Sequence, residues 1–251
     1  MTSPDGVDAR SASVRPLLEL EAIRAAYDTI EVLHGVDLAV RPGEVMALLG
    51  PNGAGKTTTL SVASGVIVPT GGRVVVAGRD VTGVAPEELS RRGLVTIPEG
   101  RGVFPNLTVK ENLRMATYAG RPLAEVEAMT YERFERLGHR RNQVVGTMSG
   151  GEQQMLAMAR GLASDPAVML LDELSMGLAP LVVKDLYEVV GQIAASGVSI
   201  LVVEQFARTV LGIATTAAIM SHGRIVAVGP PEEIEEKLSA AYLGGEREAN
   251  R

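Results

Sequence analysis

The chain has 251 residues, 46% of them hydrophobic and 22% charged, which suits one globular domain with ample material for a core. It contains no cysteine, so a disulfide framework, thiol catalysis and a cysteine-based metal site are excluded. Its formal net charge of −6, with 3% aromatic residues and no tryptophan, argues against nucleic-acid binding.

The chain begins with a polar segment, residues 1–16, that lacks the apolar core of a signal peptide. We predict a disordered tail here. The longest uncharged run, residues 209–223, is shorter than the ~20 apolar residues that a membrane-spanning helix needs. We therefore predict a protein that is soluble by itself and that reaches a membrane only through a partner.

After this tail, short apolar runs alternate with helical patterns. Strands are predicted at residues 17–22, 36–40, 45–49, 73–77, 94–97, 168–171, 199–203, 217–220 and 225–228. Helices are predicted at residues 57–64, 123–134, 149–163 and 182–193. This alternation predicts an α/β fold built on buried parallel strands. The mostly helical stretch from residue 100 to 163 is predicted to be a helical subdomain inserted into the core.

A phosphate-binding loop lies between the strand at 45–49 and the helix at 57–64. Its residues match G-x-x-x-x-G-K-[ST] and are Gly50, Pro51, Asn52, Gly53, Ala54, Gly55, Lys56 and Thr57. The glycines let backbone N–H groups turn toward phosphate oxygens, and the helix N-terminus adds positive potential. We expect Lys56 to reach the β- and γ-phosphates, Thr57 to bind Mg²⁺ and Thr58 to touch phosphate. The alternative is an ordinary glycine-rich turn, which the flanking strand and helix disfavour.

An acidic pair, Asp172 and Glu173, follows directly after the apolar strand at 168–171. Open α/β sheets bind ligands at the carboxyl ends of their strands. Asp172 suits Mg²⁺, which prefers oxygen ligands, and Glu173 suits a base that activates water. A solvated acidic turn is the simpler interpretation, but the phosphate loop in the same chain favours the catalytic one.

A third motif, Ser149-Gly150-Gly151-Glu152, has the pattern of a capping box that opens a helix. The simplest interpretation is a well-capped helix. The functional one adds a second anion site at the helix N-terminus, formed with Ser149 and Gly150.

Together these motifs resemble those of ABC transporter ATP-binding subunits, over residues 17–245, with 246–251 as a C-terminal tail. The resemblance implies a P-loop NTPase (RecA-like) core with an antiparallel β-subdomain and the inserted helical subdomain. It also implies that ATP and Mg²⁺ lie between two subunits, with Ser149, Gly150, Gly151 and Glu152 of one closing on the phosphate loop of the other. Tyr27 lies where the family stacks adenine on an aromatic ring.

The chain departs from the family pattern at two positions near the predicted site. Glu99 stands where most relatives have Gln, and Gln205 stands where most have a His that contacts the γ-phosphate. We expect Glu99 to sense Mg²⁺ or water, and Gln205 to donate through its amide although it cannot titrate. These departures, with Ser175-x-Gly-Leu-Ala-Pro180 and Ala241-Tyr-Leu-Gly244, resemble the smaller (LivF-type) ATPase of branched-chain amino-acid importers.

This resemblance implies two permease partners, a second ATPase subunit and, indirectly, a substrate-binding protein. It favours a heterodimer, with a homodimer possible, at the inner face of the cell membrane and otherwise in the cytoplasm. Four alternatives stay open from sequence: the ATPase of a urea or amide importer, an exporter ATPase, a soluble ABC ATPase without a transporter, and a module that senses ATP without turnover.

Overall fold

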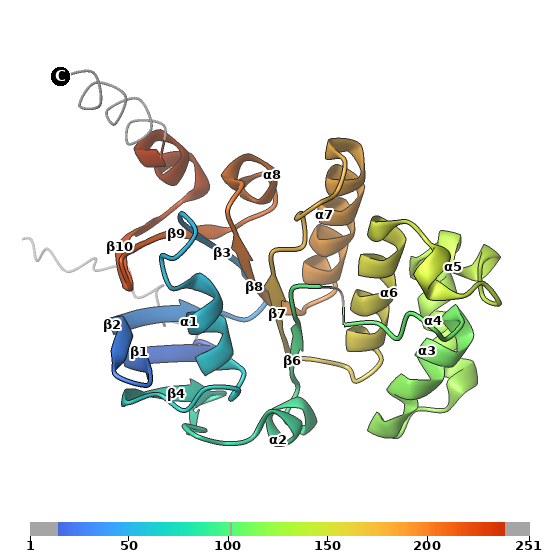
Figure 1. Cartoon of the computed structure of the whole chain (residues 1–251), viewed down its shortest axis with the longest axis horizontal. Helices are drawn as coiled ribbons and strands as arrows, with labels where there is room; N and C mark the ends of the chain where they lie inside the picture. The colour runs from blue at the N-terminus through green and yellow to red at the C-terminus, as the bar shows by residue number, and fades with distance from the viewer. Residues whose placement is uncertain (1–14, 101, 239–251) are drawn as a thin grey trace, which may run out of the picture.

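The computed structural model describes residues 15–100 and 102–238. The first 14 residues of the predicted N-terminal tail, the predicted tail at 246–251 and the motif at 241–244 lie outside the described residues. In the described ranges, no helix combines the length and apolar character needed to cross a membrane. The strands form two sheets, and helices cover the larger sheet on both faces (Figure 1).

The smaller sheet is antiparallel, with strand order β2-β1-β4-β5. Its strands are β1 (Leu18–Tyr27), β2 (Ile30–Val40), β4 (Gly71–Val76) and β5 (Arg79–Asp80). The first two are longer than the predicted 17–22 and 36–40, because charged residues on their exposed faces interrupt the apolar pattern. An example is Arg24, whose Nε lies 2.7 Å from Oε1 of Glu31 across the two strands.

The larger sheet has the order β10-β9-β3-β8-β7-β6. Its described strands pair in parallel except for the edge strand β10, which pairs antiparallel with β9. Its strands are β3 (Val45–Leu49), β6 (Leu94–Ile97), β7 (Val168–Asp172), β8 (Ser199–Glu204), β9 (Thr216–Ser221) and β10 (Arg224–Gly229). All residues of β3, β7 and β8 are buried, as expected for parallel strands covered on both faces.

Helices are α1 (Lys56–Ala63), α2 (Pro86–Arg91), α3 (Val109–Met115), α4 (Leu123–Arg133), α5 (Glu135–His139), α6 (Gly150–Leu162), α7 (Pro180–Ala195) and α8 (Ala207–Leu211). Short 3₁₀ turns add Ala116–Ala119 and Val145–Thr147. Helices α3 to α6 follow one another between β6 and β7. We propose that they form the helical subdomain predicted at residues 100–163.

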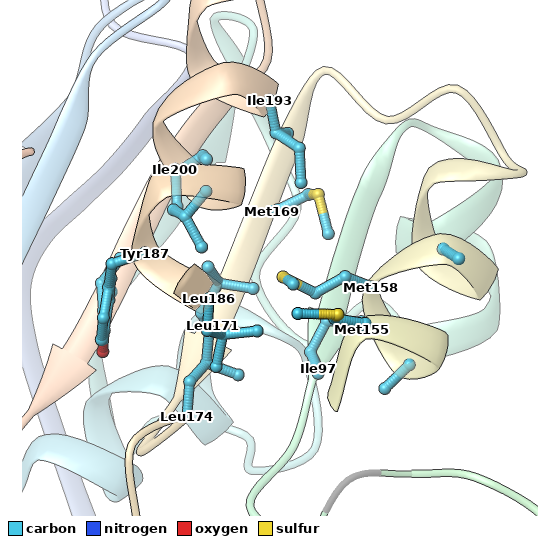
Figure 2. Packing of buried hydrophobic residues seen from close by; sticks show 14 of the residues in the cluster. Ile97, Met155, Met158, Met169, Leu171, Leu174, Leu186, Tyr187, Ile193 and Ile200 are labelled. Atoms are coloured by element: carbon cyan, nitrogen blue, oxygen red, sulfur yellow. The ribbon is translucent and has the colours of Figure 1, made fainter. Parts of the chain in front are cut away.

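The core has two parts because side chains of β3 alternate between the sheet's faces. Met46 and Leu48 pack with α1 and the smaller sheet, whereas Val45, Ala47 and Leu49 face the other part. In that second part, Met155 and Met158 of α6 point toward Met169 and Leu171 of β7 (Figure 2). Helices α1 and α6 therefore pack on opposite faces of the larger sheet.

Candidate functional site

The phosphate loop joins the buried strand β3 to the N-terminus of α1. Gly55 is the N-cap residue of α1 at φ 105°, and Gly53 has φ 79°. Both values lie in the region that favours glycine. A Cβ on Gly50 would lie 2.3 Å from the carbonyl oxygen of Met220, so the backbone approach there also requires glycine. The loop thus presents the free N–H groups of a helix start, where anions bind.

Lys56, the first residue of α1, has only 4% of its side chain exposed. Its Nζ donates to the carbonyl oxygen of Pro51 at 3.2 Å and lies 3.6 Å from Oε1 of Glu173. The ammonium group is therefore held over the loop, next to the carboxylate that follows β7. An incoming phosphate would compete with Glu173 for this cation.

Asp172 and Thr57 meet because β3, β8 and β7 are parallel neighbours whose carboxyl ends share one edge of the sheet. The hydroxyl of Thr57 lies 3.5 Å from Oδ1 of Asp172, which is 3% exposed. Burial, and then repulsion from Glu173 and Glu99, raises the pKa of Asp172 to about 6, against weaker opposing effects of Lys56 and Thr57.

Glu173 turns the chain sharply after β7. Its φ of 43° is left-handed, which is unusual for a residue with a Cβ. Its N–H donates to the carbonyl oxygen of Val203 on β8 at 3.0 Å. This turn keeps Leu174 fully buried while the Glu173 carboxylate faces Lys56.

The two residues that depart from the family pattern are both exposed. Glu99 follows the end of β6, and Gln205 follows the end of β8. Glu99 lies close enough to Asp172 to raise its pKa. Gln205 shares with Gly50, Pro51 and Ser175 the wall of an open pocket of about 1260 Å³. Their predicted roles toward Mg²⁺ and phosphate stay predictions.

The predicted signature segment forms the capping box expected of it. Oγ of Ser149 accepts from the N–H of Glu152 at 3.4 Å, and Oε2 of Glu152 accepts from the N–H of Ser149 at 3.0 Å. Nε of Arg140 lies 2.8 Å from Oε1 of Glu152. Helix α6, which this segment begins, packs on the opposite face of the sheet from α1. Among the described residues, the hydrogen bonds and ion pairs of Ser149 and Glu152 do not reach the phosphate loop of the same chain.

The adenine position predicted from sequence, Tyr27, ends β1 and is 51% exposed. The hairpin that carries it lies beside the loop, since a Cβ on Gly55 would meet Cδ2 of Leu33 at 2.9 Å. The hairpin therefore contacts the end of the phosphate loop, and the Tyr27 side chain at the end of β1 is about half exposed.

Sequence reasoning gave no role to Glu204, the last residue of β8. It is 1% exposed, and its carboxylate accepts hydrogen bonds from Ser175 and Tyr187. The sequence does contain one indication of a special role, because Glu204 ends an otherwise apolar strand and a buried carboxylate needs polar partners.

Comparison with known proteins identifies the family of this chain. The ABC transporter family model matches residues 33–175, which span the phosphate loop, the signature segment and the acidic pair. The chain belongs to the ABC transporter family. It is an ABC-type ATPase, and the family hydrolyses ATP to drive transport. The predicted fold class is likewise confirmed, since the matching solved structures are ATP-binding cassettes.

Two curated relatives differ in the transport that their names describe. The chain is 39% identical to the high-affinity branched-chain amino acid transport ATP-binding protein BraG of Pseudomonas aeruginosa, over 91% of this chain and 100% of the relative. It is 32% identical to the lipopolysaccharide export system ATP-binding protein LptB of Haemophilus influenzae, over 91% of this chain and 97% of that relative. A solved ADP conformation of an ATP-binding cassette has a TM-score of 0.81 at 29% identity, covering 89% of this chain and 95% of that one.

Proposed function

We propose that this chain is the ATP-binding and ATP-hydrolysing subunit of an importer for branched-chain or other hydrophobic amino acids. The observation that carries the ATPase role is the convergence of Lys56, Thr57, Asp172 and Glu173 at one edge of the sheet. The 39% identity to the branched-chain amino-acid relative, over its whole length, supports the cargo class. Export is the second candidate, supported by the 32% identity to LptB.

In this proposal each group at the site has one role. Lys56, released from Glu173 by the incoming anion, binds the β- and γ-phosphates, while the loop N–H groups bind the remaining oxygens. Glu173 then accepts a proton from the attacking water. Gln205 donates its amide to the γ-phosphate, and Tyr27 stacks on the adenine.

The oxygen donors of Thr57 and Asp172 fit Mg²⁺, which prefers hard ligands and is usually held by one or two protein oxygens together with substrate phosphates. In the described ranges, no group of three or more acidic, histidine or cysteine side chains is arranged to hold a metal ion by itself, so phosphate oxygens and water would complete the coordination. When bound, Mg²⁺ would neutralise charge on the phosphates. Glu99 would reach the ion or its water.

A second ATPase subunit is supported by the position of the signature segment, which begins a helix on the opposite face of the sheet from the helix of the phosphate loop. We propose that residues 149–152 of a second subunit close on the nucleotide, with Ser149 and the helix N-terminus binding phosphate. A heterodimer is favoured and a homodimer is possible. ABC ATPase subunits act with membrane permease components. Here we propose two permeases that hold the dimer at the inner membrane face, with a substrate-binding protein as an indirect partner.

The hydrolytic role is tested by Glu173→Gln, which keeps the shape of the side chain and removes the base. Turnover should fall about 10²- to 10⁴-fold while ATP still binds, because general-base catalysis contributes that factor. Glu188→Gln, on the 62% exposed side chain of α7, is the matched control and should leave both unchanged. Full turnover in Glu173→Gln would contradict the role.

The transport role is tested by capturing the tagged chain from detergent-solubilised native membranes and identifying its partners by mass spectrometry. Two permeases, a second ATPase and a binding protein support import. Recovery of export components instead would favour the second candidate. Recovery of soluble partners alone, from a preparation that still hydrolyses ATP, would contradict both.

A further inference from the structure

A buried carboxylate, Glu204, lies beside the phosphate site without belonging to it. It accepts from the N–H and the hydroxyl of Ser175, each at 2.9 Å, and from the hydroxyl of Tyr187. No Lys or Arg in the described part of the chain forms an ion pair with it. Three donors thus converge on an acceptor-only group, which offsets the loss of water around a buried carboxylate.

The two donor residues are buried and lie on either side of a stretch that carries exposed side chains. Ser175 begins the loop that follows Glu173, and Tyr187 lies on α7, which begins at Pro180 directly after that loop. Between them, Met176 is 50% exposed and Leu181 is 73% exposed. One carboxylate therefore binds the residue at which the loop begins and a residue within the helix that follows the loop.

The strand that carries Glu204 also contacts the site. Glu204 is the last residue of β8 and is buried, whereas the next residue, Gln205, lies past the end of the strand and is exposed at the pocket by the phosphate loop. The carbonyl oxygen of Val203 holds the N–H of Glu173 at 3.0 Å. A small shift of the end of β8 would therefore move the proposed base and the loop at residues 175–179 together.

We propose that Glu204 is a positioning residue that transmits nucleotide binding, sensed at Gln205, to the exposed loop at residues 175–179. This inference rests on the proposed function, because the nucleotide at the phosphate loop is its input. The coupling runs through contiguous hydrogen bonds to a single group, so removing one donor without adding a polar atom should break it.

The experiment uses the absence of cysteine in the chain. Met176→Cys gives one exposed thiol, which is labelled with an environment-sensitive fluorophore, and the full-length protein is titrated with a non-hydrolysable ATP analogue and Mg²⁺. We expect a nucleotide-dependent change in fluorescence. Tyr187→Phe in the labelled protein should abolish that change while the Kd of the analogue, measured by calorimetry, stays the same.

Tyr131→Phe is the matched control, because it also removes a tyrosine that donates to a glutamate, Glu127 at 3.2 Å, but on α4. It should retain the response. Glu204→Gln, which keeps the shape and one acceptor oxygen, should retain part of it. A lower Tm in Tyr187→Phe with a full response would overturn the proposal, as would no response in the labelled parent. Failure of the labelled parent to bind the analogue would instead contradict the proposed function itself.

Discussion

Replacement of Asp172 by Asn should stabilise the folded protein while it abolishes Mg²⁺-dependent hydrolysis. Burial and two neighbouring carboxylates raise the pKa of Asp172 to about 6 from its ordinary value of 3.8. Ionising this group in the folded chain at neutral pH therefore costs about 3 kcal/mol relative to the unfolded chain. Asn has the same shape and carries no charge, so it removes that cost.

The size of the gain should depend on pH in a defined direction. A raised carboxyl pKa means that the folded protein binds the proton more tightly, so protonation favours folding. The destabilisation by Asp172 thus develops as pH rises from 3.8 to about 6 and is complete above that window. The advantage of Asp172→Asn should be largest above pH 7, fall to about half near pH 5 and nearly vanish by pH 4.

The assay is urea unfolding of both proteins at several pH values in the presence of a chelator, which removes any contribution of bound Mg²⁺. Asp165→Asn is the control, because that side chain is 84% exposed and Asn also tolerates its left-handed φ of 55°. It should change the free energy of unfolding by less than about 0.5 kcal/mol. Destabilisation by Asp172→Asn at pH 7.5 would mean that Lys56 and Thr57 outweigh burial, and would refute the reasoning.

Three further substitutions, one of them paired with a compensating change, test the signature segment and the adenine position. Gly151→Ala places a Cβ 2.2 Å from Cγ1 of Val182, so it should lower the free energy of unfolding by about 1–3 kcal/mol, and Val182→Ala should restore most of it. Ser149→Ala removes the cap of α6 and should cost about 1 kcal/mol in urea unfolding. Tyr27→Ala should leave unfolding unchanged, because the ring is half exposed, but should weaken ATP binding by about 1–3 kcal/mol in calorimetry; unchanged affinity would exclude adenine stacking.

The sequence predicts the central strands well because β3, β7 and β8 are buried on both faces and appear as unbroken apolar runs. It predicts the outer sheet less well. Strand β1 shows one apolar face that bulges interrupt, and the two-residue β5 has no apolar pattern at all. Both are defined by pairing with neighbouring strands, which a single segment does not encode.

The site shows the same difference between local patterns, which the sequence encodes, and contacts between distant residues, which it does not. The structure brings together four residues that the sequence singles out: Lys56, Thr57, Asp172 and Glu173. They could be singled out because each belongs to a local motif that follows a strand. Glu204 was not, since its partners Ser175 and Tyr187 are 29 and 17 residues away in sequence. Only the strand order, which inserts β8 between β3 and β7, brings these three residues together.

Two features at the end of β7 destabilise the folded protein. Asp172 is buried with a raised pKa, and Glu173 adopts a left-handed conformation that costs about 1–2 kcal/mol in a residue with a Cβ. Neither is explained by packing, because an uncharged residue followed by glycine would satisfy the same turn. Both are explained if the carboxylates must face Lys56 and a phosphate-bound cation. If Asp172 served mainly as a structural ion pair, Asp172→Asn would lower the free energy of unfolding. If it serves catalysis, the same substitution should raise the free energy of unfolding and lower ATP turnover.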